Sequence, residues 1–286
     1  MTSLKGLAPA KINLTLHVTG QREDGYHFLD SLVVFADIGD EIIVTPQDGV
    51  TLSVSGPFAE GVPTDQSNIV LKALESLKAL HGIDVGAHIA LHKHLPNAAG
   101  IGGGSSDAAT TLSMLAKLWD VPELSPSSKE ALNLGADVPA CMSAPSPVRM
   151  SGIGEELSPV VELPDCAMVL ANPRVSVPTG QIFTALPSKT NAPMETIPNG
   201  ISFDSFVDWV TSQRNDLLGP ARRIAPEIDV VLGRLAASPL VAATGMSGSG
   251  ATCFGLVKNM ADARKVARAI QVSEMNWWVA PAQILK

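Results

Sequence analysis

The sequence predicts an α+β fold in two domains, and three observations support this prediction. The chain has 286 residues, a length at which two domains are slightly favoured over one. Its apolar residues alternate in some segments and recur with a helical period in others. The expected strands and helices follow one another without a regular βαβ rhythm, which favours α+β over α/β. A proline-rich passage, Pro139 to Pro164, can hold the crossing between the domains, which we expect to be residues 1–155 and 156–286.

The elements of the first domain follow from the spacing of its apolar residues. Alternation of apolar and polar residues over 10–18 predicts a half-buried strand. A period of three to four residues over 68–81, ended by Gly82, predicts a helix. The other expected elements are a polar turn at 21–25, strands at 29–38 and 41–45 around a Gly39-Asp40 turn, a short strand at 87–91 and a helix at 106–119.

The second domain is expected to mix buried strands with helices. A continuous apolar run at 167–171 predicts a buried strand. Residues 186–200 are rich in Pro, Ser, Thr and Asn, a composition typical of a mobile loop. The remaining expected elements are a helix at 217–235, a glycine cluster at 245–250, a strand at 251–257 and a helix at 261–270.

Composition excludes several classes of function. Twenty basic and 28 acidic residues give a formal net charge of −8, which argues against nucleic acid as a partner. The three cysteines form no C-x-x-C pair, so neither a zinc site nor a disulfide framework is expected. No apolar run has the length of a membrane span, and polar residues interrupt the N-terminal segment where a signal peptide would lie. We therefore expect a cytoplasmic protein with no membrane partner.

The most informative segment is the glycine-rich loop Pro96–Ser106, which leads into the helix expected at 106–119. Its glycines permit backbone conformations in which N–H groups turn inward. The helix adds unpaired N–H groups and the positive end of its dipole, so the two together can bind an anion, most often a phosphate. The structural alternative is a glycine-rich turn capped by serine.

Three known classes of phosphate-binding protein do not account for this loop. A P-loop needs a lysine after its second glycine, and the loop contains no lysine. A Rossmann fingerprint needs a glycine where Ser105 stands. A protein kinase needs H-R-D and D-F-G strings that this sequence lacks. The loop therefore predicts a phosphate site of another class.

Four further residues can carry chemistry, and the first three also have a structural alternative. Lys11 is either a solvated strand lysine or a cation placed at a site. Asp137 is either a helix N-cap, which the local pattern alone favours, or a general base. Tyr26, the sole tyrosine, is either a surface ring or a platform on which a flat ligand stacks. His27 beside it can read the edge of a base.

The order of three motifs resembles the GHMP kinase superfamily of small-molecule kinases. They are Pro9-Ala10-Lys11-Ile12-Asn13-Leu14, Pro96-x-x-x-Gly100-Ile101-Gly102-Gly103-Gly104-Ser105-Ser106 and Gly245-x-x-Gly248-x-Gly250. Further segments resemble one branch, whose alcohol substrate carries a cytidine diphosphate and serves non-mevalonate isoprenoid synthesis. These are Arg22-Glu23-Asp24-Gly25-Tyr26-His27, Gly135-Ala136-Asp137-Val138-Pro139 and Pro173-x-x-x-Val177-Pro178-Thr179. The resemblance implies a two-domain fold with the active site in the cleft between the domains, and phosphorylation of the substrate's 2-hydroxyl by ATP.

The resemblance also implies roles for single residues. Asp137 would orient or deprotonate the hydroxyl, while Lys11 would keep that carboxylate ionised and offset charge on the transferring phosphoryl group. Tyr26 and Phe183 would sandwich the cytosine, and His27 would read its edge. The other expected substrate contacts are Asn13, Thr179, Gly248 and Gly250, with the two glycines near the diphosphate. The expected ATP contacts are Asn68, Lys93, Pro96, Gly100, Gly102, Gly103, Gly104, Ser105 and Ser106.

The cofactors implied are ATP and Mg²⁺, and the metal ligands stay open. Gly103 and Gly104 stand where relatives have a serine pair, so either a later serine, or water and phosphate oxygens alone, would hold the metal. A monomer or a weak homodimer is expected. The alternative functions are a homoserine or mevalonate type of GHMP kinase, a non-catalytic sensor on the same fold, and a decarboxylase relative. Homoserine and mevalonate need no aromatic clamp for a base, and a sensor needs neither Lys11 nor Asp137.

Overall fold

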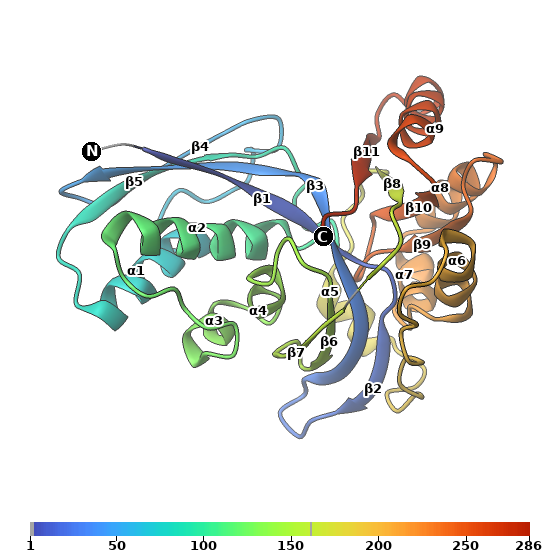
Figure 1. Cartoon of the computed structure of the whole chain (residues 1–286), viewed down its shortest axis with the longest axis horizontal. Helices are drawn as coiled ribbons and strands as arrows, with labels where there is room; N and C mark the ends of the chain where they lie inside the picture. The colour runs from blue at the N-terminus through green and yellow to red at the C-terminus, as the bar shows by residue number, and fades with distance from the viewer. Residues whose placement is uncertain (1–2, 161) are drawn as a thin grey trace. The chain divides into compact units, whose positions relative to one another are not determined.

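The computed structural model describes residues 3–160 and 162–286, and the chain forms two compact units (Figure 1). Unit 1 comprises the N-terminal residues up to Ala10 together with Ile38–Asn97 and Gly102–Ala144. Unit 2 comprises Lys11–Asp37, Ala98–Ile101 and Pro145–Lys286. Helices and mixed sheets confirm the α+β class.

Among the described residues, one sheet has seven strands in the order β4-β5-β3-β6-β7, with β1 and β2 also paired to β3. These strands are β1 (Leu4–Asn13), β2 (His17–Gln21), β3 (His27–Gln47), β4 (Thr51–Ser55), β5 (Gly86–His92), β6 (Val148–Gly152) and β7 (Glu156–Pro159). The long strand β3 continues from unit 2 into unit 1: its first part pairs with β6 and its last part with β5. β4 and β5 are parallel, and the β3 pairs with β2, β5 and β6 are antiparallel.

In unit 1, two long helices pack side by side against the strands (Figure 1). The helices of this unit are α1 (Ile69–His81), α2 (Gly103–Trp119), α3 (Lys129–Leu134) and α4 (Val138–Cys141). The helix predicted at 68–81 is confirmed: Asn68 caps α1 with its side chain, and Gly82 ends the helix in the left-handed conformation. The buried apolar stripe of α1, including Leu74 and Leu77, belongs to the core of this unit.

Unit 2 contains a four-stranded antiparallel sheet in the order β11-β8-β10-β9. Its strands are β8 (Ala167–Asn172), β9 (Ala243–Met246), β10 (Cys253–Val257) and β11 (Trp278–Gln283). Every residue of β8 and β10 is buried, which confirms the buried strand predicted at 167–171. The helices are α5 (Thr179–Thr184), α6 (Phe203–Ser212), α7 (Leu218–Ile224), α8 (Glu227–Ala236) and α9 (Met260–Ser273), and α8 and α9 pack on the sheet (Figure 1).

The turn predicted at Gly39-Asp40 is wrong, because β3 runs through both residues. Gly39 is needed for a different reason: a Cβ there would overlap the backbone carbonyl of Ala8. Asp40 is fully buried, and its carboxylate is satisfied by partners in the same unit, described below. Although this dipeptide locally indicates a turn, Gly39 allows β3 to lie close to the backbone of Ala8, and Asp40 belongs to a buried ion pair.

Two further element predictions need correction. The helix expected at 217–235 is two helices, because Pro226 lacks an N–H and forces Ala225 out of helical geometry. The strand at 10–18 is not half-buried: Lys11, Asn13 and the other polar residues that alternate with its apolar ones are at most 3% exposed. The segment also divides between β1 and β2.

Candidate active site

Three of the sequence motifs meet in unit 2. The N–H of Lys11 donates to the carbonyl of Ile101 at 2.9 Å. The N–H of Asn13 donates to Ser247 Oγ at 3.0 Å, and that hydroxyl donates onward to the carbonyl of Gly100 at 2.9 Å. The end of β1, the first part of the glycine-rich loop and the glycine cluster at 245–250 therefore form one hydrogen-bonded group.

The two glycine-rich segments pack backbone against backbone. Gly100 and Gly248 have φ of 74° and 56°, values that favour glycine. A Cβ on Gly100 would lie 2.5 Å from Ser247 O, and a Cβ on Gly248 would lie 2.8 Å from Gly100 O. Both distances are shorter than real Cβ contacts, so these two positions require glycine for mutual packing as well as for conformation.

We expect Gly100→Ala to lower the free energy of unfolding by about 2–4 kcal/mol, because it adds a backbone clash to left-handed strain. Gly61→Ala is the matched control, since Gly61 has φ 78° and no atom within 4 Å of a built Cβ. The control loses about 1 kcal/mol from strain alone. Urea unfolding measures both. Equal losses in the two variants would show that the packing against Ser247 has no energetic role.

Two of the predicted substrate residues of unit 2, Asn13 and Thr179, contact this group. Asn13 is 1% exposed and donates through Nδ2 to Ser31 Oγ at 2.8 Å. Its Oδ1 is buried and accepts from no described residue, so it is suited to a donor group on a ligand. Thr179, at the start of α5, shares a hydrogen bond of 2.9 Å with Ser249. The structure thus brings Asn13 and Thr179 to the loop that contains Gly248 and Gly250.

An aromatic pair lies near the turn after β2. The rings of His27 and Phe183 are stacked, with centroids 4.8 Å apart and an interplanar angle of 27°. Burial lowers the pKa of His27, and the charge of Lys189 lowers it further, so the imidazole is neutral at pH 7. A neutral imidazole offers one donor and one acceptor, and Nε2 is buried with no partner among the described residues. Tyr26 beside it is 55% exposed.

A buried ion triad in unit 1 contains Lys93, which was predicted to hold ATP. Its ammonium donates to Asp40 and, at 2.7 Å, to Asp107; all three side chains are at most 4% exposed. Asp40 Oδ1 also accepts the N–H groups of His94 and Leu95 at 2.6 and 2.9 Å. Burial raises the pKa of Asp107 to about 7, against the opposing effect of Lys93. The two carboxylates raise the pKa of Lys93 despite its burial.

Sequence reasoning missed Asp40 and Asp107 as partners of Lys93. Asp107 stands in the first turns of α2, directly after the serines of the glycine-rich motif. Asp40 was interpreted as a turn residue. The separations of 53 and 14 residues along the chain leave no periodic signal that could have joined the three side chains.

The N-terminus of α2 has the form predicted for an anion site. Gly102 precedes the helix with φ 62°, and no side chain caps the helix there. Ser106 Oγ is buried and has no partner among the described residues, so its oxygen fits the ligand preference of Mg²⁺. Among the described residues, no group of three or more His, Cys, Asp or Glu could hold a metal ion.

The remaining predicted residues have defined positions in the two units. Asp137 precedes α4, but its side chain makes no capping hydrogen bond, so the N-cap alternative does not describe it. Lys11 is 3% exposed, so the alternative of a solvated strand lysine is wrong. Asn68 Oδ1 accepts from the N–H of Val70 and its Nδ2 donates to Pro63 O, which uses both polar groups in the helix cap.

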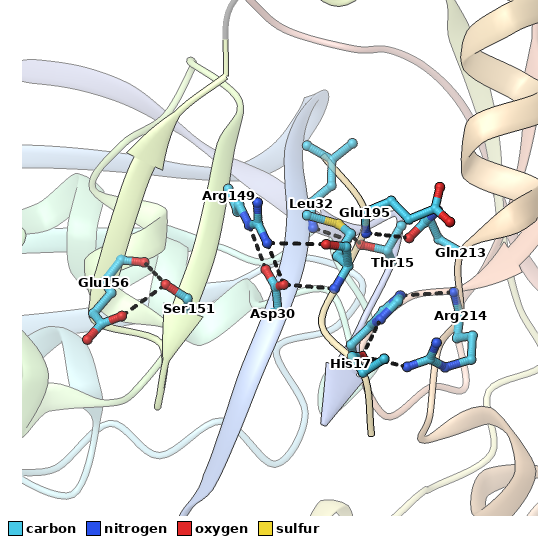
Figure 2. Close-up of polar contacts among 12 residues, drawn as sticks. Thr15, His17, Asp30, Leu32, Arg149, Ser151, Glu156, Glu195, Gln213 and Arg214 are labelled. Carbon is cyan, nitrogen blue, oxygen red and sulfur yellow. Dashed lines mark hydrogen bonds and ion pairs between the residues drawn. The ribbon is translucent and has the colours of Figure 1, made fainter. Parts of the chain in front are cut away.

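The loop at 186–200 contains no helix or strand, as predicted, yet part of it is firmly anchored (Figure 2). Arg149 on β6 makes a two-point ion pair with Asp30 on β3, at 2.8 and 2.6 Å. Asp30 also accepts the N–H of Met194 at 2.8 Å. His17 bonds the carbonyl of Ala192 through Nδ1 and accepts the N–H of Arg214 through Nε2. The expectation of a mobile loop therefore does not extend to residues 192–194.

Within the described residues, no helix combines the length and the apolar character needed to cross a membrane.

Two family models and several named relatives match this chain, and the relatives cover nearly all of its length. The profile described as "GHMP kinases N terminal domain" matches residues 68–145, and "GHMP kinases C terminal" matches residues 202–274. A 4-diphosphocytidyl-2-C-methyl-D-erythritol kinase from Dinoroseobacter shibae is 51% identical, covering 97% of this chain and 94% of the relative. The enzyme of the same name from Ruegeria pomeroyi is 49% identical, covering 99% and 100%.

Two solved structures of kinases are also similar to this chain. A crystal structure of 4-(cytidine 5'-diphospho)-2C-methyl-D-erythritol kinase matches with a TM-score of 0.76 and 32% identity, covering 99% of this chain and 100% of that one. A homoserine kinase from Cytophaga hutchinsonii matches with a TM-score of 0.72 at 17% identity, covering 100% and 96%, which shows the fold alone.

The fold and the site thus define a small-molecule kinase of the GHMP class, which uses ATP. Within that class, the chain belongs to the family of the 4-diphosphocytidyl-2-C-methyl-D-erythritol kinases. The resemblance that the sequence motifs predicted is confirmed.

Proposed function

We propose that this kinase transfers the γ-phosphoryl group of ATP to the 2-hydroxyl of 4-diphosphocytidyl-2-C-methyl-D-erythritol, a step of non-mevalonate isoprenoid precursor synthesis. The observation that carries the proposal is the stacked pair of His27 and Phe183, with a neutral imidazole whose Nε2 has no partner among the described residues. Such a pair suits a nucleobase, which needs a flat apolar surface and an edge partner. Homoserine and mevalonate offer no base to fill it.

Lys11 and Asp137 act as the catalytic pair. Asp137 orients the 2-hydroxyl and accepts its proton while the oxygen bonds to the γ-phosphorus and ADP leaves. Lys11 offsets the negative charge of the transferring group. One residue that positions the hydroxyl and one that stabilises charge are what phosphoryl transfer needs, because positioning and charge stabilisation supply most of its rate enhancement.

The ATP phosphates bind to backbone N–H groups at the N-terminus of α2, which the dipole of this long helix makes electropositive. The residues proposed to contact ATP are Asn68, Lys93, Pro96, Gly100, Gly102, Gly103, Gly104, Ser105 and Ser106. Lys93 has two of its three donors committed to carboxylates, which leaves one for the nucleotide. Ser106 Oγ is the protein oxygen proposed to hold Mg²⁺, whose role is to neutralise phosphate charge.

The substrate contacts belong to unit 2. Asn13 Oδ1 accepts from a substrate hydroxyl, since no described residue donates to it. Thr179 and the loop with Gly248 and Gly250 bind the diphosphate. Tyr26 covers the face of the cytosine opposite Phe183.

We further propose a cytoplasmic location, a monomer or weak homodimer without nucleic-acid or membrane partners, and a domain division at 155/156.

Measuring ADP release with the cytidyl substrate, homoserine and mevalonate side by side tests the proposal. Turnover is expected with the cytidyl substrate alone. Turnover of homoserine or mevalonate without turnover of the cytidyl compound would refute the proposed substrate. Absence of turnover with all three, despite ATP binding, would favour a sensor.

We expect Tyr26→Ala to raise KM for the cytidyl substrate roughly 5- to 100-fold, because stacking on an aromatic ring contributes about 1–3 kcal/mol per base. The effect on kcat is small, since the stack exists in the ground state and the transition state alike. Tyr26→Phe, which keeps the ring, is the control and retains a wild-type KM. Steady-state kinetics measure both, and an unchanged KM in the alanine variant would exclude stacking on Tyr26.

A further inference from the structure

Asn215 connects the glycine cluster at 245–250 with the segment that begins β2. The turn after β2 leads to His27, the residue proposed to contact the base. It stands in the loop between α6 and α7, and this loop pairs with the residue before β2. The N–H of Leu16 donates to Arg214 O at 2.8 Å, and the N–H of Asp216 donates to Leu16 O at 2.8 Å. A turn then connects β2 to β3, whose first residue, His27, pairs with Gln21 at the end of β2. All of these residues belong to unit 2.

Every polar group of the Asn215 side chain is used. Its Nδ2 donates to the carbonyls of Met246 and Gly248, at 2.7 and 3.0 Å. Its Oδ1 accepts the N–H of Leu217 at 2.9 Å. Three hydrogen bonds fix the amide in one orientation, and only a group with two donors and an acceptor can make them.

The bonds from Asn215 set the direction of two peptide groups in the loop, Met246-Ser247 and Gly248-Ser249, while the N–H of Gly250 donates to the carbonyl of Ser247 between them. In a trans peptide, C=O and N–H point in opposite directions, so turning the carbonyl of Gly248 toward Asn215 turns the N–H of Ser249 away. The N–H of Ser247 donates to Thr252 O. No hydrogen bond within the described residues uses the N–H groups of Gly248 and Ser249. Two adjacent N–H groups of this kind are suited to an anion.

We propose that Asn215 is a positioning residue for the substrate's diphosphate: by holding the carbonyl of Gly248, it turns the N–H of Ser249, next to the unused N–H of Gly248, toward that anion, at a fixed separation from the base bound beside His27. This inference deepens the proposed function and rests on it, since the diphosphate is that of the proposed substrate. A neutral amide suits the task because it donates twice without adding a charge next to the phosphates.

The test compares the binding of CDP and of cytidine by titration calorimetry in the wild type and in Asn215→Asp. Aspartate keeps the acceptor for Leu217 and loses both donors to the loop. The Kd for CDP is expected to rise roughly 10- to 100-fold, as for lost hydrogen bonds to a charged group. The Kd for cytidine is expected to change less than about twofold, because its base contacts are untouched. Equal weakening of both ligands, or of neither, overturns the positioning role.

Asp216→Asn is the matched control on the same loop. Asp216 accepts the N–H of Val18 and the amide of Asn191, and it bonds no residue of the glycine cluster. Its variant is expected to keep the wild-type ratio of the two Kd values even if its thermal stability falls. Should Asn215→Asp not fold, Asn215→Ala removes both donors without adding charge and carries the same expectation.

The wild-type measurement separates the proposed diphosphate site from the proposed role of Asn215. Wild-type protein that binds CDP no more tightly than cytidine contradicts the diphosphate site of the proposed function, and the role of Asn215 fails with it. Wild-type protein that prefers CDP, with an equal preference in the Asn215 variants, contradicts the role of Asn215 alone.

Discussion

Replacing Asp137 by asparagine is expected to lower kcat by about 10²- to 10⁴-fold, the range attributed to a lost general base. ATP binding is expected to persist, because the proposed nucleotide contacts do not include this carboxylate. Asparagine has the same shape, and the Asp137 side chain makes no capping hydrogen bond that the exchange could break, so the variant preserves α4 while removing the proton acceptor. Single-turnover kinetics and nucleotide titration measure the two effects separately.

Asp120→Asn is the control for this exchange. Asp120 ends α2 in the left-handed conformation, which asparagine also tolerates, so the variant should retain wild-type kcat. A kcat for Asp137→Asn within a few-fold of the wild type would refute the role of Asp137 as base. A loss of kcat accompanied by an equal loss of ATP binding would assign Asp137 to the nucleotide site instead.

Local elements of this fold were predictable because their signals are local. The helix at 69–81 has an apolar stripe, an Asn cap and a glycine stop within one segment. The break at Ala225-Pro226 also had a local signal, the proline itself, and treating 217–235 as one helix gave that signal too little weight. The buried strand β8 is a continuous apolar run that a single window shows.

Other features depend on pairs of segments far apart in the chain, which no local pattern encodes. Position 39 requires glycine because the backbone of Ala8 lies against it. Position 100 requires glycine because the backbone carbonyl of Ser247 lies against it. The sequence motifs predicted that the glycine-rich loop and the third motif belong to one enzyme. They did not predict that the two segments pack on each other, or that Asn215 holds one of them in place.

The triad of Asp40, Lys93 and Asp107 leads to the largest expected effect on stability. Lys93→Met removes the cation and leaves two buried carboxylates without it, which is expected to cost about 3–5 kcal/mol. Methionine has a similar length, so lost packing is a minor part of the effect. Urea unfolding of the variant measures the loss, and a change below about 1 kcal/mol, the usual value of an exposed pair, would refute a structural role for the triad.

A triple variant separates this structural role from the proposed contact with ATP. Combining Lys93→Met with Asp40→Asn and Asp107→Asn removes both uncompensated charges, and Asn at position 40 can still accept the N–H groups of His94 and Leu95. Most of the lost stability should therefore return, because neutral replacement of a buried ionic cluster is often tolerated. If the remaining donor of Lys93 holds the nucleotide, KM for ATP stays raised by about tenfold or more in this stable protein, as for one hydrogen bond to a charged group. A wild-type KM for ATP in the triple variant would instead make Lys93 a structural cation that supports the first turns of α2 without contacting ATP.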